Sequence, residues 1–104
     1  MPVFRLEPIS ETLDDARWET TTMNKTCWVN AASDADARHA IEQQSQRTID
    51  YIPRAAKMGT PWSDNSFVRC TPDSRKTVPA GYYVTEGRLL ELLVSVQGVK
   101  RLLA

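Results

Sequence analysis

The chain has 104 residues, 41% of them hydrophobic, which is enough for one compact core and too little for two ordinary domains. The 13 Lys and Arg residues balance the 13 Asp and Glu residues. A net charge of zero excludes the strong overall field that drives nonspecific binding to phosphate backbones. We therefore expect one small domain over residues 1–104.

The first residues, MPVFRLEPI, carry none of the features of a secretion signal, namely a basic leader, an apolar segment and a small-residue cleavage site. Apolar runs such as residues 92–94 are far shorter than the roughly 20 residues that cross a membrane. We expect a soluble, cytoplasmic protein without a membrane partner, in which Cys27 and Cys70 stay reduced.

Alternating and β-prone residues predict strands in the first third of the chain. Residues 3–7 alternate between apolar and polar side chains. Residues 18–23 and 26–31 are two runs rich in threonine, tryptophan and valine, and Asn24 and Lys25 between them suit a tight turn. We expect a hairpin over these two runs.

A helix is expected after this hairpin. The Ser33 hydroxyl suits an N-cap, and Asp34 and Asp36 stand at the positive end of the helix dipole. Because Pro53 disfavours helical geometry in the residue before it, we expect the helix to end near Tyr51.

The C-terminal segment allows two interpretations. Leucines and valines at three- and four-residue spacing favour a helix that begins at Arg88. The alternative is a hairpin of residues 82–85 and 88–92 around Glu86 and Gly87. We favour the helix, whose broad apolar stripe suits the cover of a sheet or a contact with a second copy.

With a further strand at residues 66–71, these elements predict an α+β fold. We expect an antiparallel sheet of three to four strands, made from residues 3–7, 18–23, 26–31 and 66–71. One helix packs on a face of this sheet, and the C-terminal helix completes the core.

Three side chains offer thiol or imidazole chemistry: Cys27, His39 and Cys70. A structural zinc site takes four such ligands in close pairs, and the chain has no close pair, so we expect no metal and no other cofactor. A small enzyme using these three residues is one functional alternative, because a cysteine and a histidine can form a nucleophilic pair.

Residues 53–65 combine two prolines with single glycine, serine, aspartate and asparagine residues, which predicts a loop, and long loops often carry binding function. The turn after residue 72 adds a second exposed basic pair. We predict a partner-binding surface made from Arg54, Lys57, Trp62, Arg75 and Lys76.

Basic residues are concentrated in residues 47–76, which suggests a nucleic-acid-binding domain as the other alternative. Three acidic residues in the same region oppose this interpretation, because they reduce its local positive charge. They are Asp50, Asp64 and Asp73.

The segment 27–46 contains a strand ending in Trp-Val, a short acidic step and then Ala-Arg in a helix. Pro61, Trp62 and Asp64, followed by residues 68–70, complete the pattern. In these features the chain resembles small bacterial proteins of uncharacterised function. The resemblance implies a bacterial or phage-like origin and an α+β fold, and it implies no activity.

Taken together, these features favour a non-catalytic protein-interaction or regulatory module. The missing catalytic constellation, the long loop and the leucine-rich end support this interpretation. Its partner is expected to be another protein or a second copy of the chain.

Overall fold

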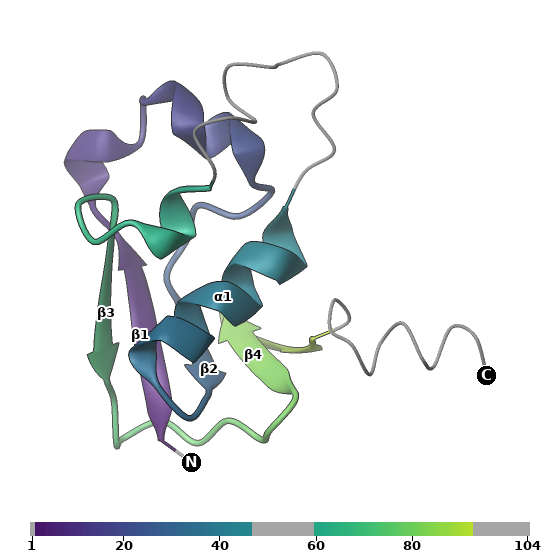
Figure 1. Ribbon diagram of the computed structural model, residues 1–104. Coiled ribbons are helices and arrows are strands. Elements are labelled where there is room, and N and C mark those ends of the chain that lie inside the picture. Colours follow the sequence, from purple (N-terminus) through teal and green to yellow (C-terminus); the bar gives the residue numbers. More distant parts are fainter. Residues whose placement is uncertain (1, 47–59, 93–104) are drawn as a thin grey trace.

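The computed structural model describes residues 2–46 and 60–92, and within them it contains one five-stranded sheet (Figure 1). All the strand pairings are antiparallel, and the strand order is β3-β1-β2-β4-β5. The strands are β1 (Val3–Pro8), β2 (Cys27–Asn30), β3 (Val68–Pro72), β4 (Tyr82–Thr85) and β5 (Arg88–Glu91).

One α-helix, α1 (Asp34–Ser45), lies across one face of this sheet (Figure 1). The Ser33 hydroxyl accepts the backbone N–H of Asp36 at 3.1 Å, which confirms the predicted N-cap. The helix ends at Ser45, earlier than predicted, because Gln46 is extended and forms an isolated β-bridge with Thr21. Residues 47–59 lie outside the described part of the chain.

The predicted hairpin of residues 18–23 and 26–31 is wrong. Residues Ala16–Thr20 form a 3-10 helix, η2, whose N-cap Asp15 accepts the backbone N–H of Arg17 at 2.9 Å. This short helix buries Trp18 edge-on against Trp62, with ring centroids 5.7 Å apart. The burial of an indole therefore outweighs the β propensity of the flanking threonines, and β2 pairs with β1 and β4 instead.

The prediction of a helix that begins at Arg88 is wrong, because residues Arg88–Glu91 form strand β5. Strands β4 and β5 form the hairpin that the alternative interpretation described. Glu86 and Gly87 connect them, with φ angles of 53° and 75°, and two left-handed residues in a two-residue loop form the type I′ turn that suits paired strands. Residues 93–104, the rest of that predicted helix, lie outside the described part.

The predicted fold class is therefore wrong in its proportions. The sheet has five strands rather than three or four, and α1 is the single α-helix among the described residues. Two further 3-10 helices, η1 (Ser10–Thr12) and η3 (Pro61–Ser63), lie in the connections at the same end of the sheet as η2 (Figure 1).

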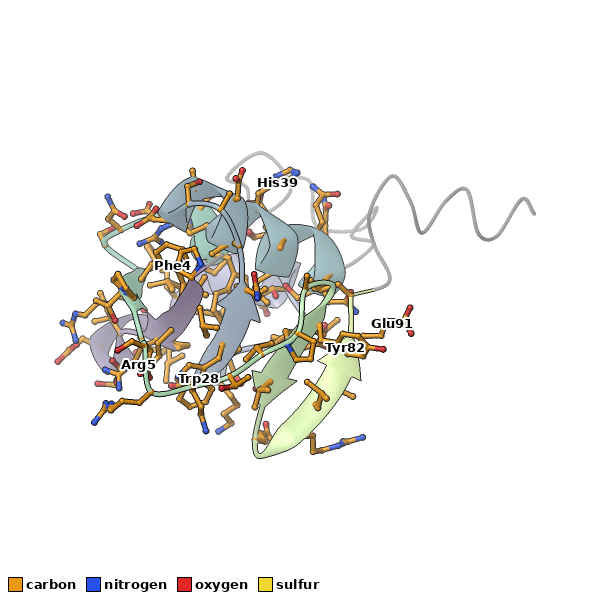
Figure 2. The ribbon with its side chains drawn as sticks, turned by 90° about the horizontal axis from the view of Figure 1, so that it is seen from below. Phe4, Arg5, Trp28, His39, Tyr82 and Glu91 are labelled. Carbon is orange, nitrogen blue, oxygen red and sulfur yellow. The ribbon has the colours of Figure 1, made fainter. Side chains whose placement is uncertain are left out.

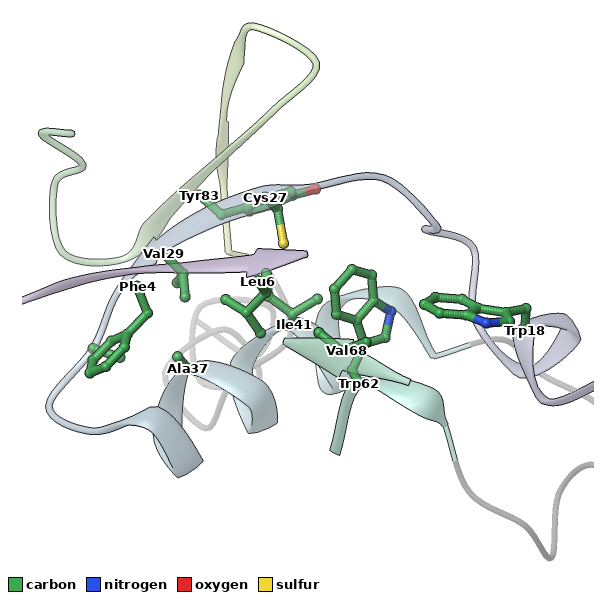
Figure 3. Close-up of a cluster of buried hydrophobic side chains, with 11 residues drawn as sticks. Phe4, Leu6, Trp18, Cys27, Val29, Ala37, Ile41, Trp62, Val68 and Tyr83 are labelled. Carbon is green, nitrogen blue, oxygen red and sulfur yellow. The ribbon is translucent and has the colours of Figure 1, made fainter. Parts of the chain in front are cut away.

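The core lies between α1 and the sheet (Figure 3). Alternate residues of β1 and β2 point into it, as the period of two in a strand requires. The indole of Trp62, carried by η3, is fully buried among them. The central side chains are Phe4, Leu6, Trp18, Cys27, Val29, Ala37, Ile41, Trp62, Val68 and Tyr83.

Candidate functional site

The face of the sheet turned away from α1 carries a row of paired side chains that crosses all five strands. Arg5 on β1 pairs with Trp28 on β2 and with Thr71 on β3, while Trp28 also pairs with Val84. Val84 in turn pairs with Leu89 on β5. We give the name open face to eight residues on this side: Arg5, Glu7, Trp28, Arg69, Thr71, Tyr82, Val84 and Leu89. By the same register Val3, Asn30 and Glu91 also lie on this side, and Val3 is buried.

None of these open-face side chains is fully buried. Leu89 is 54% exposed and Tyr82 is 36% exposed, while Val84 between them is half-buried. Figure 2 shows Arg5 and Trp28 pointing away from α1, which carries His39 on its outer side. Tyr82, Val84 and Leu89 therefore form an apolar patch on the β4–β5 part of the open face, beside the exposed Glu91 that pairs with Tyr82.

The connection between β3 and β4 is fastened to this face at Trp28. The indole N–H of Trp28 donates to the Asp73 carboxylate at 3.0 Å, and this bond is the main reason why the pKa of Asp73 is lowered. The ammonium nitrogen of Lys76 lies 4.6 Å from the centre of the Trp28 ring, in a cation–π contact. Trp28 thus positions a positive charge beside the apolar patch.

Other basic side chains on and around the open face stand beside carboxylates. Arg5 contacts Glu7 at 3.2 Å, and Arg69 lies 3.9 Å from the same carboxylate. The Arg75 guanidinium lies 3.6 Å from Asp73. Exposed pairs of this kind contribute little to stability, but they reduce the positive field on this side of the sheet.

The five residues predicted to bind a partner differ in where they lie. Arg75 and Lys76 are exposed and lie close to Trp28, as a binding surface requires. Trp62 is fully buried, so its indole belongs to the core and not to a surface. The remaining two predicted residues, Arg54 and Lys57, lie outside the described part of the chain.

The predicted partner-binding surface does not include Trp28, Tyr82 or Leu89. A signal for Trp28 was present, because Cys27 and Val29 are apolar neighbours with the period of two that faces a core. That alternation places Trp28 on the opposite side of the strand. The sequence places Leu89 on an edge strand only in the hairpin interpretation, and the helix was favoured.

The three residues of the enzyme hypothesis do not meet. Cys27 and Cys70 both pair with Leu6, one on each side of β1, so their Cα atoms are about 9.6 Å apart, too far for a disulfide. Burial raises the pKa of the Cys27 thiol, and burial followed by the nearby Asp34 carboxylate raises that of Cys70 to about 11. His39 is exposed on α1.

A shallow pocket of about 380 Å³ lies between α1 and the segment around η3. Three of the charged side chains that line it have partners: Arg38 donates to Asp34 at 3.3 Å and to the Trp62 carbonyl at 3.2 Å, while Glu42 accepts from the Thr60 hydroxyl at 2.6 Å. These bonds hold the η3 segment against the helix. No group of three His, Cys, Asp or Glu residues in the described ranges is arranged to hold a metal ion.

Comparisons of the chain with protein-family models, with curated proteins and with solved structures find no match. The resemblance to small bacterial proteins therefore stays a prediction. Within residues 2–46 and 60–92, no helix has the length and apolar character needed to span a membrane.

Proposed function

We propose that the protein is a non-catalytic binding module that docks a partner protein on its open face. The observation that carries this proposal is the row from Arg5 through Trp28 and Val84 to Leu89, which leaves an apolar patch on the side opposite α1. Exposed apolar groups that are contiguous and rimmed by polar side chains are typical of protein-binding sites.

The chemistry of this surface suggests the kind of partner. Leu89, Tyr82 and Val84 offer an apolar centre, while Lys76 and Arg75 stand at one border. A partner that places an apolar side chain over β4 and β5 and a carboxylate near Lys76 would match both features. The raised pKa values of both thiols support a role without nucleophilic catalysis, because the thiolate is the reactive species.

Site-specific crosslinking tests this proposal. A photoreactive amino acid placed at Tyr82 should capture one defined protein in cells that contain the natural partner, whereas the same probe at Leu13 should not. Leu13 is a suitable control because it is 40% exposed and lies in the segment after η1, outside the sheet.

The captured protein is then purified and titrated against three chains: the natural one, Tyr82→Lys and Leu13→Lys. We expect Tyr82→Lys to weaken binding at least about tenfold, because it places a charge in the apolar centre, and Leu13→Lys to leave binding unchanged. Equal crosslinking from both positions, or equal affinities of the two variants, contradicts docking on the open face.

Binding of single-stranded nucleic acid is a second candidate, favoured by the contact between Lys76 and Trp28. It has weaker support, since the indole N–H is bonded to Asp73 and Arg5, Arg69 and Arg75 stand beside carboxylates. Affinity for a single-stranded oligonucleotide that falls steeply with salt and is lost in Lys76→Met would favour this candidate over protein docking.

A further inference from the structure

The two edges of the sheet differ in their protection against further strand pairing. Strand β3 forms one edge, and it carries the exposed, charged Arg69 and ends at Pro72, which has no N–H to donate. Strand β5 forms the other edge, with Leu89 and Leu90 at its centre and no proline. Among the described residues, no strand pairs with the outer side of β5.

The register of the β4–β5 hairpin decides which backbone groups of β5 face outward. Thr85 and Arg88 close the two-residue turn and therefore form a hydrogen-bonded pair, so the next pair, Val84 and Leu89, is non-hydrogen-bonded. The Leu92 N–H, which donates to the Gly81 carbonyl at 2.8 Å, continues this alternation. The N–H and C=O of Leu89 consequently point away from β4, toward the outer edge.

We propose that β5 pairs antiparallel with β5 of a second copy, about a two-fold axis at Leu89. Residues that face each other across antiparallel strands share one face of the sheet, so a two-fold pairing must be centred on a residue and not between two. With the axis at Leu89, the N–H and C=O of this residue in one copy bond to the C=O and N–H of the same residue in the other copy. The two exposed Leu89 side chains then meet on the open face.

This pairing joins two five-stranded sheets into one of ten strands and places the two open faces side by side. The interface is smaller than that of a typical stable complex, so we expect a reversible dimer whose population depends on concentration. The pairing does not require the docking function proposed above, although both involve Leu89, because the pairing depends on backbone groups of β5 and the docking depends on side chains of the open face.

Sedimentation of the full chain over a range of concentrations tests the pairing with two variants. Leu89→Pro removes the outward N–H and adds a ring at the edge, while the bonds between β4 and β5 stay intact. Leu89→Thr keeps the N–H and removes most of the apolar side chain. We expect the natural chain to dimerise, Leu89→Pro to raise the dissociation constant about a hundredfold, and Leu89→Thr to raise it about tenfold or less.

The Leu89 amide should also exchange its hydrogen more slowly as the concentration of the natural chain rises. A natural chain that stays monomeric, with Leu89 exchange independent of concentration, overturns the proposal and indicates that the edge is covered within the chain or unused. Equal weakening by the two variants also overturns it, because the contact then depends on the side chain. Circular dichroism and thermal unfolding verify that Leu89→Pro folds, and crosslinking from Tyr82 to a different protein tests docking separately.

Discussion

Trp62 donates its indole N–H to the Thr21 hydroxyl at 3.0 Å, inside the core. The same hydroxyl donates to Ser45 at 2.6 Å, and Ser45 in turn donates to the Ile41 carbonyl at 2.7 Å. This chain of bonds joins η3, the segment after η2 and the last turn of α1. A buried polar network of this kind is stabilising when its members are satisfied and costly when one is removed.

Replacing Thr21 with valine should therefore destabilise the fold. The change leaves the buried indole N–H of Trp62 without its acceptor, and we expect a loss of about 1–3 kcal/mol of unfolding free energy. Urea denaturation followed by tryptophan fluorescence measures this loss. The neighbouring Thr22→Val change is the control, because Thr22 is exposed and should alter stability by less than about 0.5 kcal/mol. Similar losses in both variants would refute a special role for the network.

Acid stability should depend on Asp64. Its pKa is lowered from 3.8 to about 2, first by hydrogen bonds from Ser66 and then by Arg17, whose guanidinium donates to Asp64 at 2.7 Å. Because the folded pKa lies below the unfolded one, this stabilisation is complete above about pH 4 and is lost as the pH falls toward 2.

The measurement is the unfolding free energy of the natural chain and of Asp64→Asn between pH 2 and 6. We expect the variant to be less stable at pH 6 and to lose less stability on acidification. Asp14→Asn is the matched control, because it is the same substitution at an exposed carboxylate. If the unfolding free energy of Asp64→Asn falls as steeply on acidification as that of the natural chain, Asp64 is not a source of the acid sensitivity.

The two thiols should be unreactive in the folded protein. Burial raises the pKa of both, so both are protonated at neutral pH, and Cys27 is also shielded from reagents. We expect a maleimide to label Cys70 slowly and Cys27 only after unfolding, with mass spectrometry of peptides identifying each site. Cys27 labelling at equal rates with and without denaturant would show that its cover opens readily.

The stability of the fold should depend on how well the residue at position 86 tolerates the left-handed backbone conformation of the β4–β5 turn. Glu86 adopts a left-handed φ of 53°, which asparagine tolerates better than glutamate or alanine. We expect Glu86→Asn to be more stable than Glu86→Ala by about 0.5–1 kcal/mol, although both remove the same charge. Thermal unfolding compares the two variants, and equal stabilities would argue against a type I′ turn.

Gly87→Ala tests the same turn from its second residue. A Cβ at Gly87 would meet no atom within 4 Å, so any cost arises from the φ of 75° and not from a clash. We expect a loss of about 1 kcal/mol in the unfolding free energy. A neutral effect would indicate that the hairpin contributes little to the stability of the fold.

Several elements were predictable because their signals are local. The alternation of residues 3–7 predicts β1, and Ser33 with the following aspartates predicts the start of α1. The N-cap uses a serine and a backbone N–H three residues away, so tertiary contacts are not needed to recognise it. A hairpin around Glu86 and Gly87 is one of the two interpretations that the sequence allows, but the leucine periodicity favours the helix; the left-handed φ angles of the turn come from the structure.

The candidate site was less predictable, since a surface depends on which face of each element is covered. Arg75 and Lys76 were correctly expected to be exposed. Trp62 stands among proline, serine and aspartate, a composition typical of loops, yet it is fully buried. Its burial results from contacts with Trp18 and Thr21, which are more than 40 residues away in the chain.

Local sequence patterns thus specify where β1, β2 and α1 lie along the chain, because hydrogen bonds within a turn and the period of two depend on neighbouring residues. The partners of each strand follow from the assembled core. Leu6 lies between Cys27 and Cys70 on separate strands, and Trp28 lies between Arg5 and Val84. These contacts join segments far apart in sequence, and the free energy that selects them is the burial of apolar surface, which the folded chain gains as a whole.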